Sequence, residues 1–279
     1  MKVSLIVVNY KSTDETINLI ESAKKIKVFE DFEIIIVDNS EGEFLKRQKI
    51  KYLNKNKNLG YAGGINAGSQ ISEGEYLFFL NPDIEFITPL DGLLKLFDEK
   101  TIACCPLMIP HKNFQLRKLP NIFYFAYDFL GFSNFFPNFF ITKKYFYEPI
   151  PKIPFEVEQP AGAALLIKRN KFFEIGKFDE KFFPVYFEDV DLCFRIKKNG
   201  YKIICDPNLK IKHKIGHSAK QMTRDQFFKI YSKNALRYFK KRGKNILFYK
   251  YIILFGLFLR GIKGTISFKI LKEFSSFKI

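Results

Sequence analysis

The chain has 279 residues, 47% of them hydrophobic, and a formal net charge of +17 at pH 7. This is enough for one large α/β domain, or for one domain with an appendage. No run approaches the roughly 18–20 apolar residues of a membrane span, and the apolar run of residues 3–8 is too short for a secretion signal. The four cysteines match no zinc-binding or redox spacing, which predicts reduced structural thiols in the cytoplasm: Cys104, Cys105, Cys193 and Cys205.

The positive charge indicates a polyanionic partner, either nucleic acid, anionic lipid or a phosphorylated substrate. The alternative is a surface that is simply rich in lysine.

Two strands and a helix are predicted at the N-terminus. Residues 3–8 form an apolar run of the kind that is buried in a parallel sheet. Ser12 and Glu15 have the capping-box spacing, which predicts a helix from there to about residue 25. Residues 33–37 predict a second strand, and residues 51–53 a short third one.

The next segments continue the alternation. Residues 58–68 are rich in Gly and Asn and predict a turn that leads into a helix, and residues 75–80 predict a strand. Residues 89–100 predict a helix and residues 102–109 another strand. Alternating units of this kind predict an open, mostly parallel sheet flanked by helices.

Ligands of such sheets bind at the carboxyl ends of the strands. Asn9, Asp38 and Asp83 all fall at predicted strand ends. These side chains are therefore candidates for a shared site.

The pattern changes after residue 110. Residues 111–155 have no clean period and predict a lid, a binding loop or small irregular helices. Residues 160–167 predict a strand, and residues 188–198 a helix that Gly200 ends. Shorter elements are predicted around them: a helix at 169–175, a turn at 176–179 and strands at 201–205 and 209–212.

The tail from about residue 223 is helical, basic and aromatic, and is followed by an apolar stretch at 246–259. A basic amphipathic helix next to an apolar helix too short to span indicates attachment to a membrane surface. The alternatives are a helical hairpin packed on the core and a dimer interface.

Three segments of the first half have side chains suited to binding a nucleotide. Asp38 can accept hydrogen bonds from a base or a ribose, although Asp-Asn-Ser is also a turn sequence. Residues 58–68 permit close approach of a diphosphate, but they match neither common phosphate-binding pattern. Asp83 can ligate Mg²⁺ or Mn²⁺, with a proline turn as the alternative.

The second half supplies further candidates. His213 and His217 follow a late strand, and one of them can complete a metal site, with a surface histidine as the alternative. Glu188 and Asp189 open a helix after an apolar run that can raise a carboxylate pKa; acidic residues in a first turn also suit the helix dipole. Asp191 is spaced to pair with Arg195.

The order of these motifs resembles glycosyltransferase family 2, with its GT-A fold, and especially the rhamnosyltransferase-like branch. The matching motifs lie between residues 2 and 218, and include Val37-Asp38-Asn39-Ser40, Asn81-Pro82-Asp83, Gly162-Ala163-Ala164 and Glu188-Asp189-Val190-Asp191. The resemblance implies a GT-A domain at 1–220 and a helical extension at 221–279. Within the domain, residues 1–110 would be the nucleotide-sugar half and 111–220 the acceptor and catalytic half.

The resemblance also implies residue roles. The nucleotide-sugar site would include Asn9, Tyr10, Asp38, Asn58, Gly60, Asn66, Gly68, Asn81 and Asp83. Asp83 and His213 would contact a divalent cation, Mg²⁺ or Mn²⁺. Asp189 would be the catalytic base beside Glu188, and Gly162 and Asp191 would lie on the acceptor side.

The implied reaction is inverting transfer of a sugar from a nucleotide diphosphate, dTDP-rhamnose or a UDP-sugar, to a saccharide acceptor, including a lipid-linked one. The setting would be the cytoplasmic face of an anionic membrane, and no nucleic acid is expected. Two departures from the family pattern are present: Asn81 replaces the first Asp of Asp-x-Asp, and lysines flank His213 where paired histidines are more usual.

Two other classes explain part of the sequence. A nucleotidyltransferase would share the sheet but carry a Gly-rich basic signature at its N-terminus, which Asn9-Tyr10-Lys11-Ser12 is not. A non-catalytic basic protein that binds membrane or nucleic acid would explain the charge, but not the carboxylates at the strand ends.

Overall fold

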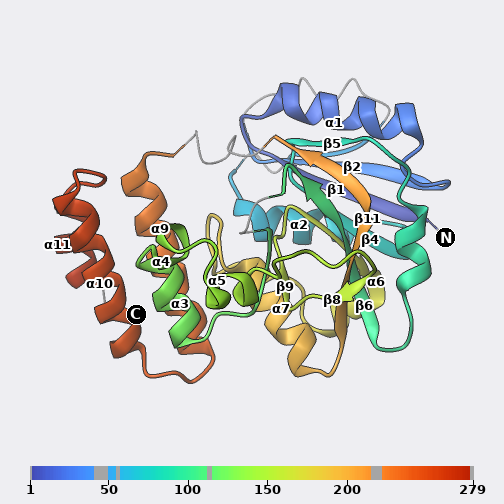
Figure 1. The fold of residues 1–279 in the computed structure, drawn as a ribbon. Coiled ribbons are helices and arrows are strands. Elements are labelled where there is room, and N and C mark those ends of the chain that lie inside the picture. The colour runs from blue at the N-terminus through green and yellow to red at the C-terminus, as the bar shows by residue number, and fades with distance from the viewer. Residues whose placement is uncertain (1, 41–49, 55–56, 112–114, 215–221, 277–279) are drawn as a thin grey trace.

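The computed structural model describes residues 2–40, 50–54, 57–111, 115–214 and 222–276. A nine-stranded sheet in the order β3-β2-β1-β4-β10-β6-β11-β5, with β8 beside β11, forms the centre of the described chain (Figure 1). Its strands are β1 (Val3–Asn9), β2 (Phe32–Asp38), β3 (Lys51–Asn54), β4 (Tyr76–Leu80), β5 (Ile84–Phe86), β6 (Thr101–Ile109), β8 (Phe155–Glu156), β10 (Ala164–Lys168) and β11 (Lys202–His213). A separate two-stranded ladder joins β7 (Leu116–Arg117) to β9 (Gln159–Pro160).

The predicted parallel sheet is confirmed in its first half, where β3, β2, β1 and β4 run parallel to their neighbours. Asn9 is in register with Asp38, so the predicted strand-end residues lie side by side. Strand β10 runs antiparallel to both β4 and β6, whereas β6 and β11 are again parallel. The sheet is therefore mostly parallel, with one reversed strand near its middle.

Helices cover both faces of the sheet. They are α1 (Thr13–Ile26), α2 (Gly60–Gln70), α6 (Arg169–Glu174) and α7 (Glu188–Lys198), with a 3₁₀ turn at Asp91–Leu96. On β4, Phe78 packs with α1 on one face, and Phe79 packs with α2, α6 and α7 on the other. Burial on both faces explains why these strands are continuously apolar instead of alternating.

The remaining helices lie at the end of the molecule opposite the N-terminus (Figure 1). They are α3 (Ile122–Phe129), α4 (Phe132–Phe135), α5 (Phe140–Tyr145), α9 (Arg224–Lys241), α10 (Ile246–Ile262) and α11 (Lys269–Ser275). A third apolar cluster joins α9, α10 and α11 to α3 and to Phe182, Phe187 and Val190 around the start of α7. No helix in the described ranges is long and apolar enough to cross a membrane.

Four local predictions were wrong. Ser12 does not form the capping box, because its hydroxyl donates to the carbonyl oxygen of Tyr10 at 3.0 Å. The Gly-rich segment is itself helix α2, and only its first residues form a turn. The helix expected at 89–100 is reduced to the 3₁₀ turn, and the two late strands are one strand, β11, with an irregularity between Asp206 and Lys210.

Candidate active site

Two cavities meet beyond the carboxyl ends of the central strands. The larger, of about 380 Å³, is lined by residues from the N-terminal half and from the start of α9. The smaller, of about 200 Å³, is lined by residues around the start of α7. Both share a wall made of Tyr61, Asn81, Val185 and Tyr186. Ligands in the two cavities would therefore be close neighbours.

The larger cavity has a backbone rim at the start of α2. Gly60 has φ +69°, and a Cβ there would lie 2.8 Å from the carbonyl oxygen of Pro184, so the position requires glycine. The Asn39 side chain donates to the Gly60 carbonyl at 3.0 Å, and Asn58 accepts from the Gly60 N–H at 2.8 Å. Tyr10 also lines this cavity and is 39% exposed.

Asn9 and Asp38 lie side by side at the ends of β1 and β2, next to the cavity-lining Asn39. Asn9 is fully buried and donates to Asp38 Oδ1 at 3.0 Å. Asp38 also accepts from the hydroxyls of Ser40, at 2.5 Å, and Tyr52, at 2.8 Å. The side chains of Asn9 and Asp38 are thus already hydrogen-bonded to other protein groups. The neighbouring Asn39, in contrast, lines the larger cavity.

The structure places Asn66 and Gly68 away from both cavities. Asn66 joins α2 to the turn at residues 178–180 by donating to the Phe178 carbonyl and to Glu180, both at 2.9 Å. A Cβ at Gly68 would lie 2.6 Å from the Ile6 side chain, so this glycine permits close packing of α2 on the sheet. The expected contacts of these residues with ribose and diphosphate are replaced by structural ones.

Asp83 and His213 meet at the edge of the smaller cavity. Asp83 is 3% exposed, and its Oδ1 lies 3.2 Å from Nε2 of His213. Nevertheless, within the described ranges, Asp83 Oδ1 makes no hydrogen bond, and neither does the buried Nδ1 of His213. Asp83 Oδ1 and His213 Nε2 are thus placed like two adjacent ligands of one ion. Ligands that lie about 2.1 Å from Mg²⁺ are roughly 3 Å from each other.

The pair fits a cation that arrives with a diphosphate. Among the described residues no group of three or more His, Cys, Asp or Glu side chains can hold a metal. Mg²⁺ and similar ions typically use one or two protein ligands and take the rest from phosphates and water. The donor set therefore suits a divalent cation shared with a ligand. His217 lies outside the described residues.

Asp189 lines the smaller cavity from the first turn of α7. Its Oδ2 accepts from the N–H of Gly162 at 3.1 Å and from Nε2 of Gln159 at 3.4 Å. A Cβ at Gly162 would lie 3.0 Å from the Asp189 Cβ, so a small residue is needed there. The Tyr61 hydroxyl holds the other side of Gly162 by donating to its carbonyl at 2.6 Å. These contacts fix the carboxylate at the cavity wall.

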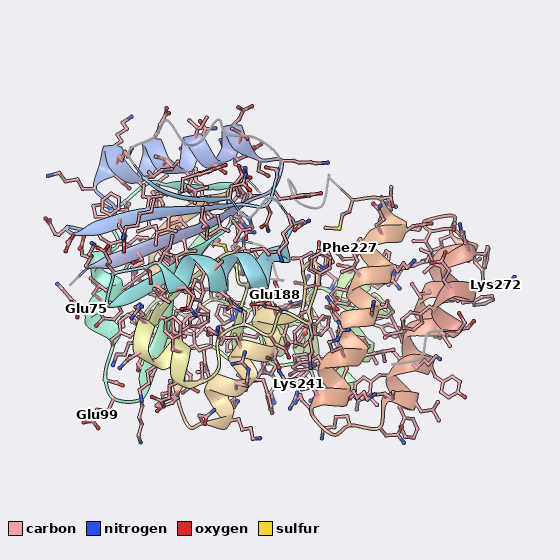
Figure 2. All side chains as sticks on the ribbon, turned by 180° about the vertical axis from the view of Figure 1, so that it is seen from behind. Glu75, Glu99, Glu188, Phe227, Lys241 and Lys272 are labelled. Atoms are coloured by element: carbon pink, nitrogen blue, oxygen red, sulfur yellow. The ribbon has the colours of Figure 1, made fainter. Side chains whose placement is uncertain are left out.

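Glu188, beside Asp189, is 4% exposed, and its Oε2 has no hydrogen-bond partner among the described residues. Burial, and then the charge of Asp189, raise the pKa of Glu188 well above its usual value. Figure 2 shows Glu188 between the sheet and the C-terminal helices. Of the two adjacent acids, Glu188 is therefore the one that its surroundings keep neutral.

Asp191 does not reach either cavity. It is 1% exposed and pairs with Arg195 at 2.9 Å and with Lys241 of α9 at 3.0 Å. The pairing with Arg195 confirms the helical spacing, and the expected acceptor-side position of Asp191 was wrong. This residue instead fastens α7 to α9.

The backbone before α7 is held in an unusual conformation. Tyr186 and Phe187 have φ of +78° and +74°, a backbone region that residues other than glycine rarely adopt. The fully buried Asn234 of α9 donates to the carbonyl oxygens of Val185, at 2.9 Å, and Tyr186, at 3.1 Å. Helix α9 therefore stabilises the turn that presents Glu188 and Asp189.

Several lining residues were not predicted. Gln226 and Ile230 of α9 line the larger cavity, and Tyr231 lines the smaller one. Arg117 enters the smaller cavity from β7, within the segment that showed no period. A few other lining residues without a predicted role stood inside recognised motifs, and motif membership was the available signal for them: Asn39, Tyr61, Pro82, Ala163 and Val190.

Comparisons with known proteins agree with this geometry. Residues 4–169 match the family described as Glycosyl transferase family 2. The chain is 26% identical over 212 residues to the low-salt glycan biosynthesis hexosyltransferase Agl10 of Haloferax volcanii, covering 72% of this chain and 63% of that protein. It is 25% identical over 260 residues to the rhamnosyltransferase WbbL of Escherichia coli, covering 86% of this chain and 93% of that protein.

The fold is similar to that of the mannosyltransferase PcManGT from Pyrobaculum calidifontis, which was solved with GDP-Man and Mn²⁺. The TM-score is 0.54 at 13% identity, over 98% of this chain and 78% of that one. This likeness shows a GT-A-like fold, as predicted. With more than half of its residues matched, the chain belongs to glycosyl transferase family 2.

Proposed function

We propose that this protein is an inverting glycosyltransferase that moves rhamnose or another hexose from a nucleotide diphosphate to a hydroxyl of a saccharide acceptor in the synthesis of a surface glycan. The observation that carries this proposal is the position of Asp189, whose carboxylate faces a cavity that shares a wall with a second, larger one. The relatives named above support a hexosyl donor. Family membership disfavours both a nucleotidyltransferase and a non-catalytic basic protein.

The larger cavity would take the nucleotide sugar, dTDP-rhamnose or a UDP-sugar. Tyr10 and Asn39 offer an aromatic ring and an amide to the base and ribose, and the rim at Asn58 and Gly60 allows close approach of the diphosphate. Asn9 and Asp38 would act indirectly: they bond to each other, and the Asn9 carbonyl accepts from the N–H of Asn39 at 2.8 Å and so helps to hold that residue in place.

Asp83 and His213 would hold Mg²⁺ or Mn²⁺, with Asn81 nearby in the shared wall. When bound, the cation supplies positive charge that stabilises the leaving diphosphate. The protein's own part is to place one carboxylate and one imidazole at the edge of the smaller cavity, which His213 lines.

In the reaction, Asp189 would accept the proton of the acceptor hydroxyl. The hydroxyl oxygen forms a bond to the anomeric carbon, the bond from that carbon to the phosphate oxygen breaks, and the configuration inverts. The hydrogen bonds from Gly162 and Gln159 keep the carboxylate aimed into the cavity while leaving it room to take the proton. Glu188 would stay protonated and neutral beside it.

The C-terminal helices would dock on an anionic membrane surface, where a lipid-linked acceptor is presented. Five large apolar side chains line the outer face of α10 at helical spacing and are 47–62% exposed: Phe248, Tyr251, Phe255, Phe258 and Ile262. Its inner face packs through Tyr249, Ile253 and Leu257. Residues 222–276 contain thirteen Lys or Arg and two acidic residues, so the charge of this region complements anionic lipid.

The test is a panel of nucleotide sugars incubated with Mn²⁺ or Mg²⁺ and read as release of nucleoside diphosphate. We expect one donor to be turned over selectively, and an added acceptor to accelerate the release. Folded protein that turns over no donor, and whose melting temperature no nucleotide raises, would contradict the proposal.

A further inference from the structure

We infer that Arg117 binds a negatively charged group of the acceptor, a phosphate or carboxylate carried close to the hydroxyl that Asp189 faces. The inference rests on the proposed function, since it assigns the smaller cavity to the acceptor. Family membership and the sequence motifs gave no role to this residue.

The position of Arg117 is set by the short ladder between β7 and β9, in which it is in register with Gln159. Its side chain lines the smaller cavity together with Asp189. Its Nε donates to Oε1 of Gln159, which is fully buried. Among the described residues the two terminal nitrogens of the guanidinium have no hydrogen-bond partner, so four N–H donors remain available to a ligand.

Arg117 forms no direct ion pair among the described residues, although, despite burial, Tyr145, Tyr231, Asp189 and Asp128 together raise its pKa. Within the described part of the chain no carboxylate lies within 4.0 Å of its guanidinium. By contrast, the nearby Arg195 pairs with Asp191 and donates to the carbonyl oxygens of Ile175 and Lys177. The terminal N–H groups of Arg117 thus lack such fixed partners, and a ligand oxyanion would supply one.

The groups around Arg117 suit an oxyanion. Tyr145 and Tyr231 line the same cavity, and burial raises the pKa of both hydroxyls, that of Tyr231 to about 12. They therefore remain neutral hydrogen-bond donors at physiological pH. Arg117 is the one Lys or Arg among the described residues that line the smaller cavity, and its planar fork matches a phosphate or carboxylate.

Arg117 and Asp189 are not in direct contact, although their charges interact. Instead Gln159 lies between them, accepting from Arg117 and donating to Asp189 at 3.4 Å. This arrangement holds a cation at a fixed separation from the base. An acceptor bound through its anionic group would thereby have its hydroxyl positioned against Asp189.

The test compares matched sugars with and without an anionic group. With the donor site filled by nucleoside diphosphate and Mn²⁺, the affinity of glucose 1-phosphate is compared with that of methyl glucoside, and that of glucuronate with that of glucose. The pair that shows a difference tells phosphate from carboxylate. We expect wild type to bind the anionic sugar of one pair about 10-fold more tightly, and Arg117→Gln to reduce this preference to within about 2-fold.

Two further variants make the result specific. Arg117→Lys keeps the charge without the two-pronged fork and is expected to give an intermediate preference. This variant replaces Arg117→Gln in the test if Arg117→Gln does not fold. Lys118→Gln removes a charge from the adjacent residue, whose Nζ lies 3.9 Å from Glu158, and is expected to leave the preference unchanged. Wild type without any preference, or a full preference retained in both Arg117 variants, would overturn the inference.

Donor hydrolysis in the absence of an acceptor separates this inference from the proposed function. Protein that cleaves a donor but shows no preference for anionic sugars retains the proposed function and loses the Arg117 site. Protein that shows the preference but cleaves no donor retains an anion site and loses the proposed function.

Discussion

The side-chain amide of Asn234 donates to the carbonyl oxygen of Tyr186 over 3.1 Å. This bond connects the middle of α9 to the strained turn directly before Glu188 and Asp189, and Tyr186 is 48 positions earlier in the chain than Asn234. A polar contact to a helix far along the sequence thus shapes the turn that presents Glu188 and Asp189.

Replacing Asn234 by Ala should leave the buried carbonyls of Val185 and Tyr186 without donors. We expect the free energy of unfolding to fall by about 1–3 kcal/mol, and turnover of the donor to fall because the turn no longer holds Asp189 in place. Denaturant melts and steady-state kinetics measure both. The matched control is Asn199→Ala, which removes an exposed bond to the Arg195 carbonyl and should change little. Equal stability and turnover in Asn234→Ala and wild type would contradict this role.

Asp189→Asn should abolish sugar transfer and leave nucleotide binding within about 2-fold of wild type, because the amide keeps the shape of the side chain but cannot accept the proton. Product formation and nucleotide affinity are measured on the same preparation. Asp191→Asn is the control: it should lower the melting temperature by weakening the pairs with Arg195 and Lys241, and retain measurable transfer. Unchanged transfer by Asp189→Asn would exclude this residue as the base.

Glu188→Gln should stabilise the protein increasingly as the pH rises. Below the unfolded-state pKa of about 4.3 the carboxyl is protonated in both states. Above it the unfolded chain ionises while the buried Glu188, whose pKa is raised, does not, so the wild type loses stability until the pH passes the folded-state pKa. Gln cannot ionise and escapes this loss.

Melting temperatures of both proteins between pH 4 and pH 8 provide the measurement. Glu174→Gln is the matched control, since Lys171 lowers the pKa of this exposed acid and the sign of any effect is reversed. Parallel curves for Glu188→Gln and wild type would show that Glu188 is not buried as a neutral acid.

Asp83→Ala and His213→Ala should each weaken nucleotide binding in the presence of Mn²⁺ by about 10-fold or more, and leave binding in EDTA unchanged. The expected difference arises because each variant removes one of two protein ligands. Calorimetric titration of UDP with and without Mn²⁺ measures it. His111→Ala, which removes a histidine 3.2 Å from Glu148 and outside the site, is the control. Identical affinities with and without Mn²⁺ in wild type would argue against any cation at this site.

Replacing Phe255 and Phe258 together by Glu should release the protein from anionic vesicles. Both side chains belong to the exposed face of α10, so burying them in a bilayer contributes to binding, and the new charges oppose it. Co-sedimentation with vesicles of anionic or of purely zwitterionic lipid is the measurement. Ile153→Glu changes an apolar residue that is 71% exposed elsewhere on the surface and should bind like wild type. Wild-type protein that does not sediment with anionic vesicles would exclude a membrane role for this face.

The sequence predicted the elements whose signals are local. Helix α7 begins and ends where its acidic first turn and Gly200 indicated, and β1, β2 and β4 follow their apolar runs. Strand direction carries no such signal: the apolar run of β10 gave no sign that it would lie antiparallel between β4 and β6.

The Gly-rich segment shows how tertiary packing can override propensity. A Cβ at Gly64 would lie 2.7 Å from the Val8 side chain, so glycines that weaken a free helix allow α2 to lie close against the sheet. The same packing places Gly68 in the core and removes it from the predicted ligand site.

The site residues that were missed depend on long-range pairing. Arg117 acquires its place through Gln159, which is 42 residues further along the chain, and Asn234 through residues nearly 50 positions earlier. No motif or period links such positions. Asp83 was singled out because it stands in a recognisable motif, although its contact with His213 needed the pairing of β11 with β5, and the metal role of the two stays a prediction.

Helix α9 lies beyond the residues that match the family, yet Gln226 and Ile230 border the larger cavity and Tyr231 borders the smaller one. The catalytic unit is thus not the same as the region that defines the family by sequence. A fragment ending at residue 220 would lack the α9 residues that line both cavities, and would also lack Asn234, which bonds to the turn before Glu188. Inactivity of such a fragment would therefore not show that the full chain is inactive. A single substitution in this helix can therefore change the lining of either cavity without touching any residue that the family match includes.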